Sequence, residues 1–131
     1  MRGLVLLFIF ILVSTQLRAA SVQGGSGSLV YSDGVDGNFN SLVYKTNSGG
    51  ILRVFDEGLS FNYDSRYDAG NLSPDKTYSV VQFSESGVGV QQEPKKIYLC
   101  AFVRMSDGCV VNVESGEQCG GEWSGSERWS S

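Results

Sequence analysis

Two stretches decide the fold class: residues 77–83 read TYSVVQF, and residues 97–103 read IYLCAFV. Both stretches are rich in β-branched and aromatic side chains, which favour strands. The second stretch is apolar on both faces, so we expect it to lie centrally in a sheet whose two faces are covered. The two stretches are therefore predicted to be core strands of a β-protein.

Shorter strands are predicted around these two. Residues 28–31 (SLVY) recur as residues 41–44 (SLVY), each followed by turn residues, which indicates two similar short strands. Residues 51–55 and 59–63 flank an Asp-Glu-Gly loop and are predicted to form a hairpin, and residues 109–114 (CVVNVE) form a further strand. No helical apolar pattern extends over twelve residues. The sequence thus predicts an all-β fold, either a small antiparallel β-sandwich (immunoglobulin-like) or a small β-barrel.

One short motif adds to this prediction. Residues 72–80 (LSPDKTYSV) have the form L-x-P-x-x-x-Y-x-V. This motif resembles the tyrosine corner that enters strand F in fibronectin type III and related immunoglobulin-like domains. The resemblance implies that Pro74 fixes the turn, Leu72 fills the core and the hydroxyl of Tyr78 bonds back to the turn backbone. It implies no particular function, because such domains bind many different things.

The ends of the chain differ in composition from the middle. Residues 1–19 combine a basic start, ten apolar residues at 4–13 and a small-residue end, which is typical of a cleaved signal peptide. Ten helical residues span about half of a ~30 Å hydrocarbon core, so no membrane insertion is expected after cleavage. We further predict a flexible lead-in at 20–27, a β domain at 28–119 and a Gly/Ser/Trp tail at 120–131. A secreted or periplasmic location follows.

Three cysteines in an exported chain allow one internal disulfide and leave one thiol. Cys109 and Cys119 flank a short turn, and their pairing is the one we favour, with the other pairings left open. Cys100 lies within an apolar run and is expected to be a buried free thiol. A tight hairpin at 106–108 would place Cys100 opposite residues near Val113, too far along the ladder to bridge Cys109.

The composition excludes several classes of function. The chain has no histidine, so it offers no Ser-His-Asp triad, Cys-His pair or HExxH zinc site. We therefore predict no enzymatic activity and no cofactor. Without residues 1–19, eight Lys and Arg stand against fourteen Asp and Glu, a net charge of −6. This charge argues against nucleic-acid binding and favours a partner with a basic surface.

The acidic cluster within residues 33–40 has spacing similar to half of a calcium loop. An EF-type loop needs a glycine directly after this half and a glutamate at its twelfth position, but the chain has Ser41 and Asn47 there. We therefore expect a solvated turn and predict no metal site. The residues of the cluster, which remain the calcium candidates of the chain, are Asp33, Asp36, Asn38 and Asn40.

The C-terminal stretch is the main candidate for binding. Trp123 and Trp129 lie close together, separated by Gly and Ser and preceded by Glu122. Exposed Trp favours contacts with a protein pocket or a sugar ring, so these three residues are predicted to bind a partner. In the alternative interpretation, Trp123 folds back onto the end of the domain and Trp129 lies in a disordered tail.

These observations together predict a non-catalytic binding protein of the inhibitor, immunity or recognition type. Its expected partner is another protein, and a basic one fits the acidic charge. Two alternatives remain: a carbohydrate-binding or adhesin-like domain that takes a glycan, and a structural subunit that assembles through an edge strand.

Overall fold

The computed structural model describes residues 19–131, and the predicted signal peptide lies outside this range except for Ala19. The described chain is all-β and antiparallel, as predicted. No helix within it is long and apolar enough to cross a membrane. The strands are β1 (Ala20–Gln23), β2 (Gly27–Val35), β3 (Asn38–Thr46), β4 (Ile51–Val54), β5 (Ser60–Asn62), β6 (Tyr78–Val88), β7 (Pro94–Arg104), β8 (Cys109–Ser115), β9 (Glu122–Trp123) and β10 (Trp129–Ser130). The helical elements are α1 (Ser65–Asp68) and the 3-10 turns η1 (Ala69–Asn71) and η2 (Gly116–Gly120).

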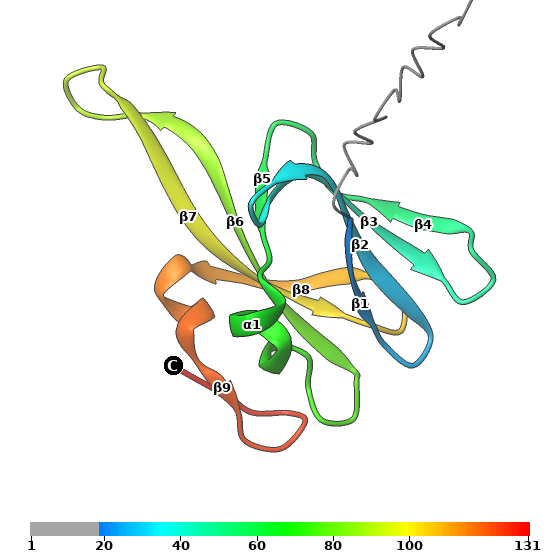
Figure 1. The fold of residues 1–131 in the computed structure, drawn as a ribbon. Coiled ribbons are helices and arrows are strands. Elements are labelled where there is room, and N and C mark those ends of the chain that lie inside the picture. Colours follow the sequence, from blue (N-terminus) through cyan, green and yellow to red (C-terminus); the bar gives the residue numbers. More distant parts are fainter. Residues whose placement is uncertain (1–18) are drawn as a thin grey trace, which may run out of the picture.

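Eight strands form one sheet in the order β1-β2-β3-β5-β6-β7-β8, with β4 on the same edge of β3 as β5. Neighbours in the sheet are thus neighbours along the chain, except that β5 follows β4 and pairs with β3. The two halves of the sheet, β1–β4 and β6–β8, are joined through the short β5 (Figure 1). Both halves contribute to a single core, whose fully or almost fully buried members include Leu29, Tyr31, Leu42, Tyr44, Phe61, Val81, Val103 and Met105.

The predicted lead-in is part of the sheet. Residues 20–23 form β1, which pairs with β2, and Val22 is buried in the core. Burial of a valine side chain contributes about 1.5–3 kcal/mol, which helps to order a strand of this length. The prediction of a flexible segment at 20–27 was therefore wrong, because the Gly and Ser residues form the turn after β1 rather than a linker.

The hairpin predicted for residues 51–63 does not form. Instead β4 pairs with residues 43–45 of β3, whereas β5 pairs with Asn38 and Phe39 of the same strand and with β6. The alternating pattern did place Phe61 correctly in the core. Because β4 and β5 follow one another along a single edge, the loop between them leaves the sheet. This loop forms one wall of the site described below.

A buried serine fixes the turn before β6. The Oγ atom of Ser73 accepts hydrogen bonds from the backbone N–H groups of Thr77 and Tyr78 at 3.1 and 3.0 Å, and donates to Asp75 at 3.0 Å. The Thr77 hydroxyl also donates to Asp75 and lowers the pKa of this carboxyl to about 2. Leu72 packs against the core, as the motif implies. The expected bond from the Tyr78 hydroxyl to residues 72–74 is not formed, because the ring of Tyr78 stacks on Trp123 instead.

Replacement of Ser73 by alanine is expected to lower the free energy of unfolding by about 2 kcal/mol. The substitution leaves the partly buried N–H of Tyr78 without its acceptor, a loss that costs about 1–3 kcal/mol, whereas the N–H of Thr77 keeps its second acceptor, Asp75. Tyr78→Phe is the control and should change stability by less than about 0.5 kcal/mol. Urea denaturation of both variants tests this assignment, which a larger loss in Tyr78→Phe than in Ser73→Ala would contradict.

Residues 116–131 cover the outer face of β6 and β7. Cys119 of η2 forms a disulfide with Cys100 of β7, with a Cα–Cα distance of 5.5 Å, and Cys109 is the free cysteine. The predictions of a Cys109–Cys119 pair and of a free Cys100 were therefore wrong. The side chain of Cys100 lies on the outer face, opposite to that of core residue Ala101, and η2 turns back along this face. The sequence spacing did not reveal this reversal of the chain.

Candidate functional site

The strand β8 is an open edge of the sheet. It pairs with β7 on one side, and no strand within residues 19–131 pairs with its other side. Its valines are unusually exposed for a strand: Val110 is 43% exposed, Val111 48% and Val113 50%. The strand at the other end of the sheet, β1, is only four residues long and has no large exposed apolar side chain. Within residues 19–131, two sheet edges therefore offer apolar side chains beside unpaired backbone: the four-residue β4, with Ile51, Leu52 and Val54, and the longer, seven-residue β8.

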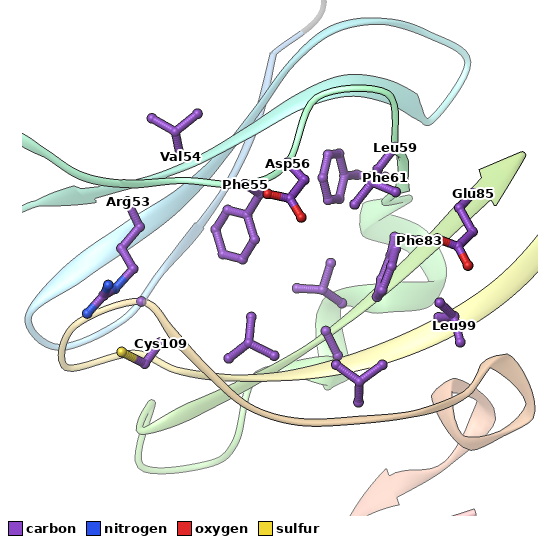
Figure 2. A pocket seen from close by; sticks show the side chains of 15 residues that line it. Arg53, Val54, Phe55, Asp56, Leu59, Phe61, Phe83, Glu85, Leu99 and Cys109 are labelled. Atoms are coloured by element: carbon purple, nitrogen blue, oxygen red, sulfur yellow. The ribbon is translucent and has the colours of Figure 1, made fainter.

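An apolar groove of about 600 Å³ lies beside the inner face of β8. The opposite wall consists of Arg53 and Val54 at the end of β4 and of Phe55, Asp56 and Leu59 in the loop before β5. Figure 2 shows Phe55, Phe61 and Phe83 around this groove. Val110 and Val113 of β8 also line it. Phe61 is buried in the core, whereas Phe55 and Phe83 are only partly covered and leave apolar surface in the groove.

One end of the groove is fixed by hydrogen bonds. The Nε atom of Arg53 donates to the carbonyl oxygen of Asp107 at 3.1 Å, which ties β4 to the turn before β8. The carboxylate of Asp107 accepts two bonds from Arg104 and one from the N–H of Cys109. The bonds from Arg104 hold the pKa of Asp107 well below its usual range. The Tyr44 hydroxyl donates to the carbonyl of Met105 at 2.6 Å, so the turn is anchored to the core as well.

A second hollow of about 370 Å³ lies beside the outer face of β8. Its floor is a cluster of aromatic side chains: Tyr78, Phe102, Trp123 and Trp129. The rings of Trp123 and Trp129 meet edge to face with their centroids 5.3 Å apart. Both indole N–H groups donate to backbone carbonyls, that of Trp123 to Asn71 at 2.9 Å and that of Trp129 to Gln118 at 2.6 Å. The two tryptophans are therefore half-buried parts of the fold that still present surface to this hollow.

The two hollows are formed by opposite faces of one strand. Register between β7 and β8 shifts near Phe102, so that Val111 has no partner on β7. After this bulge, Val113 faces the groove, whereas Val111, Asn112 and Glu114 face the aromatic hollow. A strand that paired with the free edge of β8 would extend the sheet, and with it the two faces beside which the hollows lie. Its alternating side chains would then point in turn to the side of the groove and to the side of the hollow.

Carboxylates dominate the rims of both hollows. Asp56 and Glu85 line the groove, and Glu114 and Glu127 line the aromatic hollow. The one basic side chain among the lining residues of the two, Arg53, is bonded to the backbone of Asp107. The site therefore combines apolar floors with a negative rim, which favours an occupant that carries both apolar and basic side chains.

The other sequence candidates are distributed differently. Glu122 lies on β9, pairs with Ser130 and does not line either hollow. The four calcium candidates belong to the β2–β3 hairpin, where Asp36 and Gly37 form the two-residue turn with positive φ. The side chain of Asn38 accepts a hydrogen bond from Asn62. In residues 19–131 no group of three or more His, Cys, Asp or Glu side chains could hold a metal ion.

Of the residues predicted from the sequence to bind a partner, Trp123 and Trp129 are brought together by the structure and line the aromatic hollow. The prediction from the sequence did not include the residues of β8. It missed the free edge of β8 and the groove beside it. The run CVVNVE in residues 109–114 gave no local signal for an edge, because apolar side chains on both faces usually indicate a central strand.

No family model, curated protein or solved structure matches this chain. The fold and the site therefore have to define its class by themselves. They define a small all-β, disulfide-linked domain with an open apolar edge strand between two hollows.

Proposed function

We propose that this chain is an exported, non-catalytic binding protein that takes up an extended strand of another polypeptide at the free edge of β8. The single observation that carries the proposal is the position of β8, which is unpaired on one side and flanked by a hollow on each face. Recognition by strand addition uses these two components: backbone hydrogen bonds supply affinity, and pockets for alternate side chains supply specificity.

The charge distribution supports a basic partner strand. Four carboxylates line the two hollows, and an apolar strand with Lys or Arg at intervals would place cations beside them. The negative charge of the whole chain acts in the same direction, because it attracts basic partners during diffusional encounter. The occupant is therefore a polypeptide segment with alternating apolar and basic side chains.

The packing of the tryptophans favours a strand over a sugar ring as the occupant. Trp123 stacks on Tyr78 with ring centroids 6.2 Å apart, and Trp129 meets both Trp123 and Phe102 edge to face. Carbohydrate recognition needs a free aromatic face and polar donors nearby. Here the indole N–H groups are already donated to the backbone.

Export is supported by two features of the chain. A disulfide such as Cys100–Cys119 forms and persists in oxidising compartments. Residues 1–19 have the pattern of a signal peptide. A secreted or periplasmic binding protein accounts for both.

Calorimetric titration with synthetic peptides tests the proposal. The probe is an eight-residue peptide in which valine alternates with lysine and threonine. One control peptide carries two prolines, which cannot pair with an edge strand, and another carries glutamate in place of lysine. The first peptide is expected to bind at least about tenfold more tightly than either control, a difference of about 1.4 kcal/mol.

Variants of the protein locate the binding. The double variant Val111→Lys and Val113→Lys should weaken binding of the basic peptide at least about tenfold, because it adds like charge to both faces of β8. Val35→Lys, at an exposed position on the β2–β3 hairpin, should leave binding unchanged. Equal binding to the β8 double variant, or retention of glycans with no binding of any peptide, would overturn the proposal.

A further inference from the structure

The hairpin of β6 and β7 extends beyond the rest of the sheet. The last residue of β6 that pairs with β5 is Ser84, and the first residue of β7 that pairs with β8 is Leu99. Residues 85–98, here called the arm, therefore form a two-stranded ribbon with no further strand on either side within the described chain. Figure 1 shows the arm projecting away from the body of the domain. A two-stranded ribbon gains little stability by itself, so its side chains are available for a partner.

The arm carries apolar and basic side chains at its surface. Ile97 is 40% exposed and Tyr98 50%, and they are preceded by Lys95 and Lys96, both of which are exposed. Neither lysine belongs to an ion pair within residues 19–131. The part of β7 that belongs to the arm, here called its outer strand, thus has the sequence Lys-Lys-Ile-Tyr at residues 95–98, and all four side chains are accessible.

Successive side chains of a strand point to opposite faces, so the four side chains form two pairs, one on each face. Lys95 and Ile97 share one face, and Lys96 and Tyr98 share the other. Each face therefore presents one apolar and one basic group. This is the chemistry that the two hollows beside β8 favour, since each combines an apolar floor with two carboxylates.

We infer that the strand bound at β8 is the outer strand of the arm of a second copy of this chain. This inference rests on the proposed function, because it names the occupant of the same site. One face of the docked strand places its apolar side chain toward the groove and its lysine on the side of Asp56. The other face lies against the aromatic hollow, with its lysine near Glu114 and Glu127. The contact joins two different surfaces, so each copy has both a donor arm and an acceptor edge.

Sedimentation equilibrium of the protein without residues 1–19 tests the inference, with three preparations. The wild type is expected to self-associate with concentration and to dissociate as salt is raised, since the charge contacts are exposed to solvent. The arm variant Lys95→Glu and Lys96→Glu should weaken association at least about tenfold. The control Lys45→Glu and Lys76→Glu makes the same change in net charge outside the arm and should weaken association much less.

A mixing experiment tests the assignment of donor and acceptor. The arm variant keeps its β8 edge, and the double variant Val111→Lys and Val113→Lys keeps its arm. Each should be monomeric alone, and an equimolar mixture should form a one-to-one heterodimer. Two variants that had each lost association through misfolding would not form this heterodimer. Absence of the heterodimer would overturn the inference.

The two proposals can fail separately. If the wild type remains monomeric at all concentrations while the valine–lysine peptide still binds at β8, the second copy is not the occupant, and the strand-binding function stands. If the wild type associates but the β8 double variant associates equally well, both the inference and the choice of β8 as acceptor are wrong.

Discussion

Replacement of Cys100 and Cys119 by alanine is expected to lower the free energy of unfolding by about 3 kcal/mol, the loss expected for a cross-link that closes a loop of this length. The two residues are 19 positions apart, and their disulfide joins η2 to the centre of β7. Without this link, residues 116–131 are held on the outer face of the sheet mainly by Trp123 and Trp129. Guanidinium denaturation of the double variant and the wild type gives the difference directly.

Cys109→Ala is the matched control and should change stability by less than about 0.5 kcal/mol, because Cys109 is the unbridged cysteine on β8. Loss of the disulfide should also affect the aromatic hollow. The tryptophan emission of the Cys100 and Cys119 double variant should shift to longer wavelength in the folded state, as the two indoles gain contact with water. A large loss of stability in Cys109→Ala with no loss in the double variant would contradict the observed pairing.

Local sequence patterns predicted the strands well. Dense β-branched and aromatic runs predicted β6 and β7, and the repeated SLVY predicted two short strands, which lie within the longer β2 and β3. The absence of helical periodicity agrees with the small helical content. These features follow from spacing along the chain, which local propensity and alternation encode.

Long-range features were outside the reach of the same patterns. The pairing of Cys100 with Cys119 depends on η2 turning back over β7, and this reversal has no local signal. The groove beside β8 exists because β4 and β5 both pair with β3, whereas two alternating runs around a short loop usually pair with each other. The position of β5 beside β6 buries Phe61, whose ring lies against that of Phe83 on β6, and this is a tertiary effect.

Of the residues that line the two hollows, only the two tryptophans were singled out as binding residues from the sequence. The tryptophans were conspicuous because large aromatic residues stood among Gly and Ser. The edge of β8 was less conspicuous because apolar side chains on both faces usually indicate a central strand. In this chain, however, each face of β8 lies beside an open hollow, and one edge of the strand is unpaired.

The end of the groove depends on close packing between a glycine and a tyrosine. Gly108 has φ = +73°, and a Cβ atom at this position would overlap the ring of Tyr44. Tyr44 has no exposed surface, and its hydroxyl bonds to the carbonyl of Met105 in the same turn. Arg53, which pairs with Tyr44 across β3 and β4, also donates to the carbonyl of Asp107 in this turn. The ring of Tyr44 therefore has little room to move.

Gly108→Ala should consequently be among the most destabilising single substitutions in the chain, with a loss of about 3 kcal/mol. Of this loss, about 1–2 kcal/mol comes from the left-handed backbone conformation and a further 1–3 kcal/mol from overpacking against a buried ring. Gly58→Ala is the matched control: its φ is +84°, and its Cβ would meet nothing within 4 Å. It should show the backbone cost alone.

Thermal and urea denaturation of both variants separate the two contributions, and equal losses in the two would show that the Tyr44 ring accommodates the added methyl group. If the tight turn also positions β8, the valine–lysine peptide should bind Gly108→Ala more weakly than Gly58→Ala under conditions where both are folded.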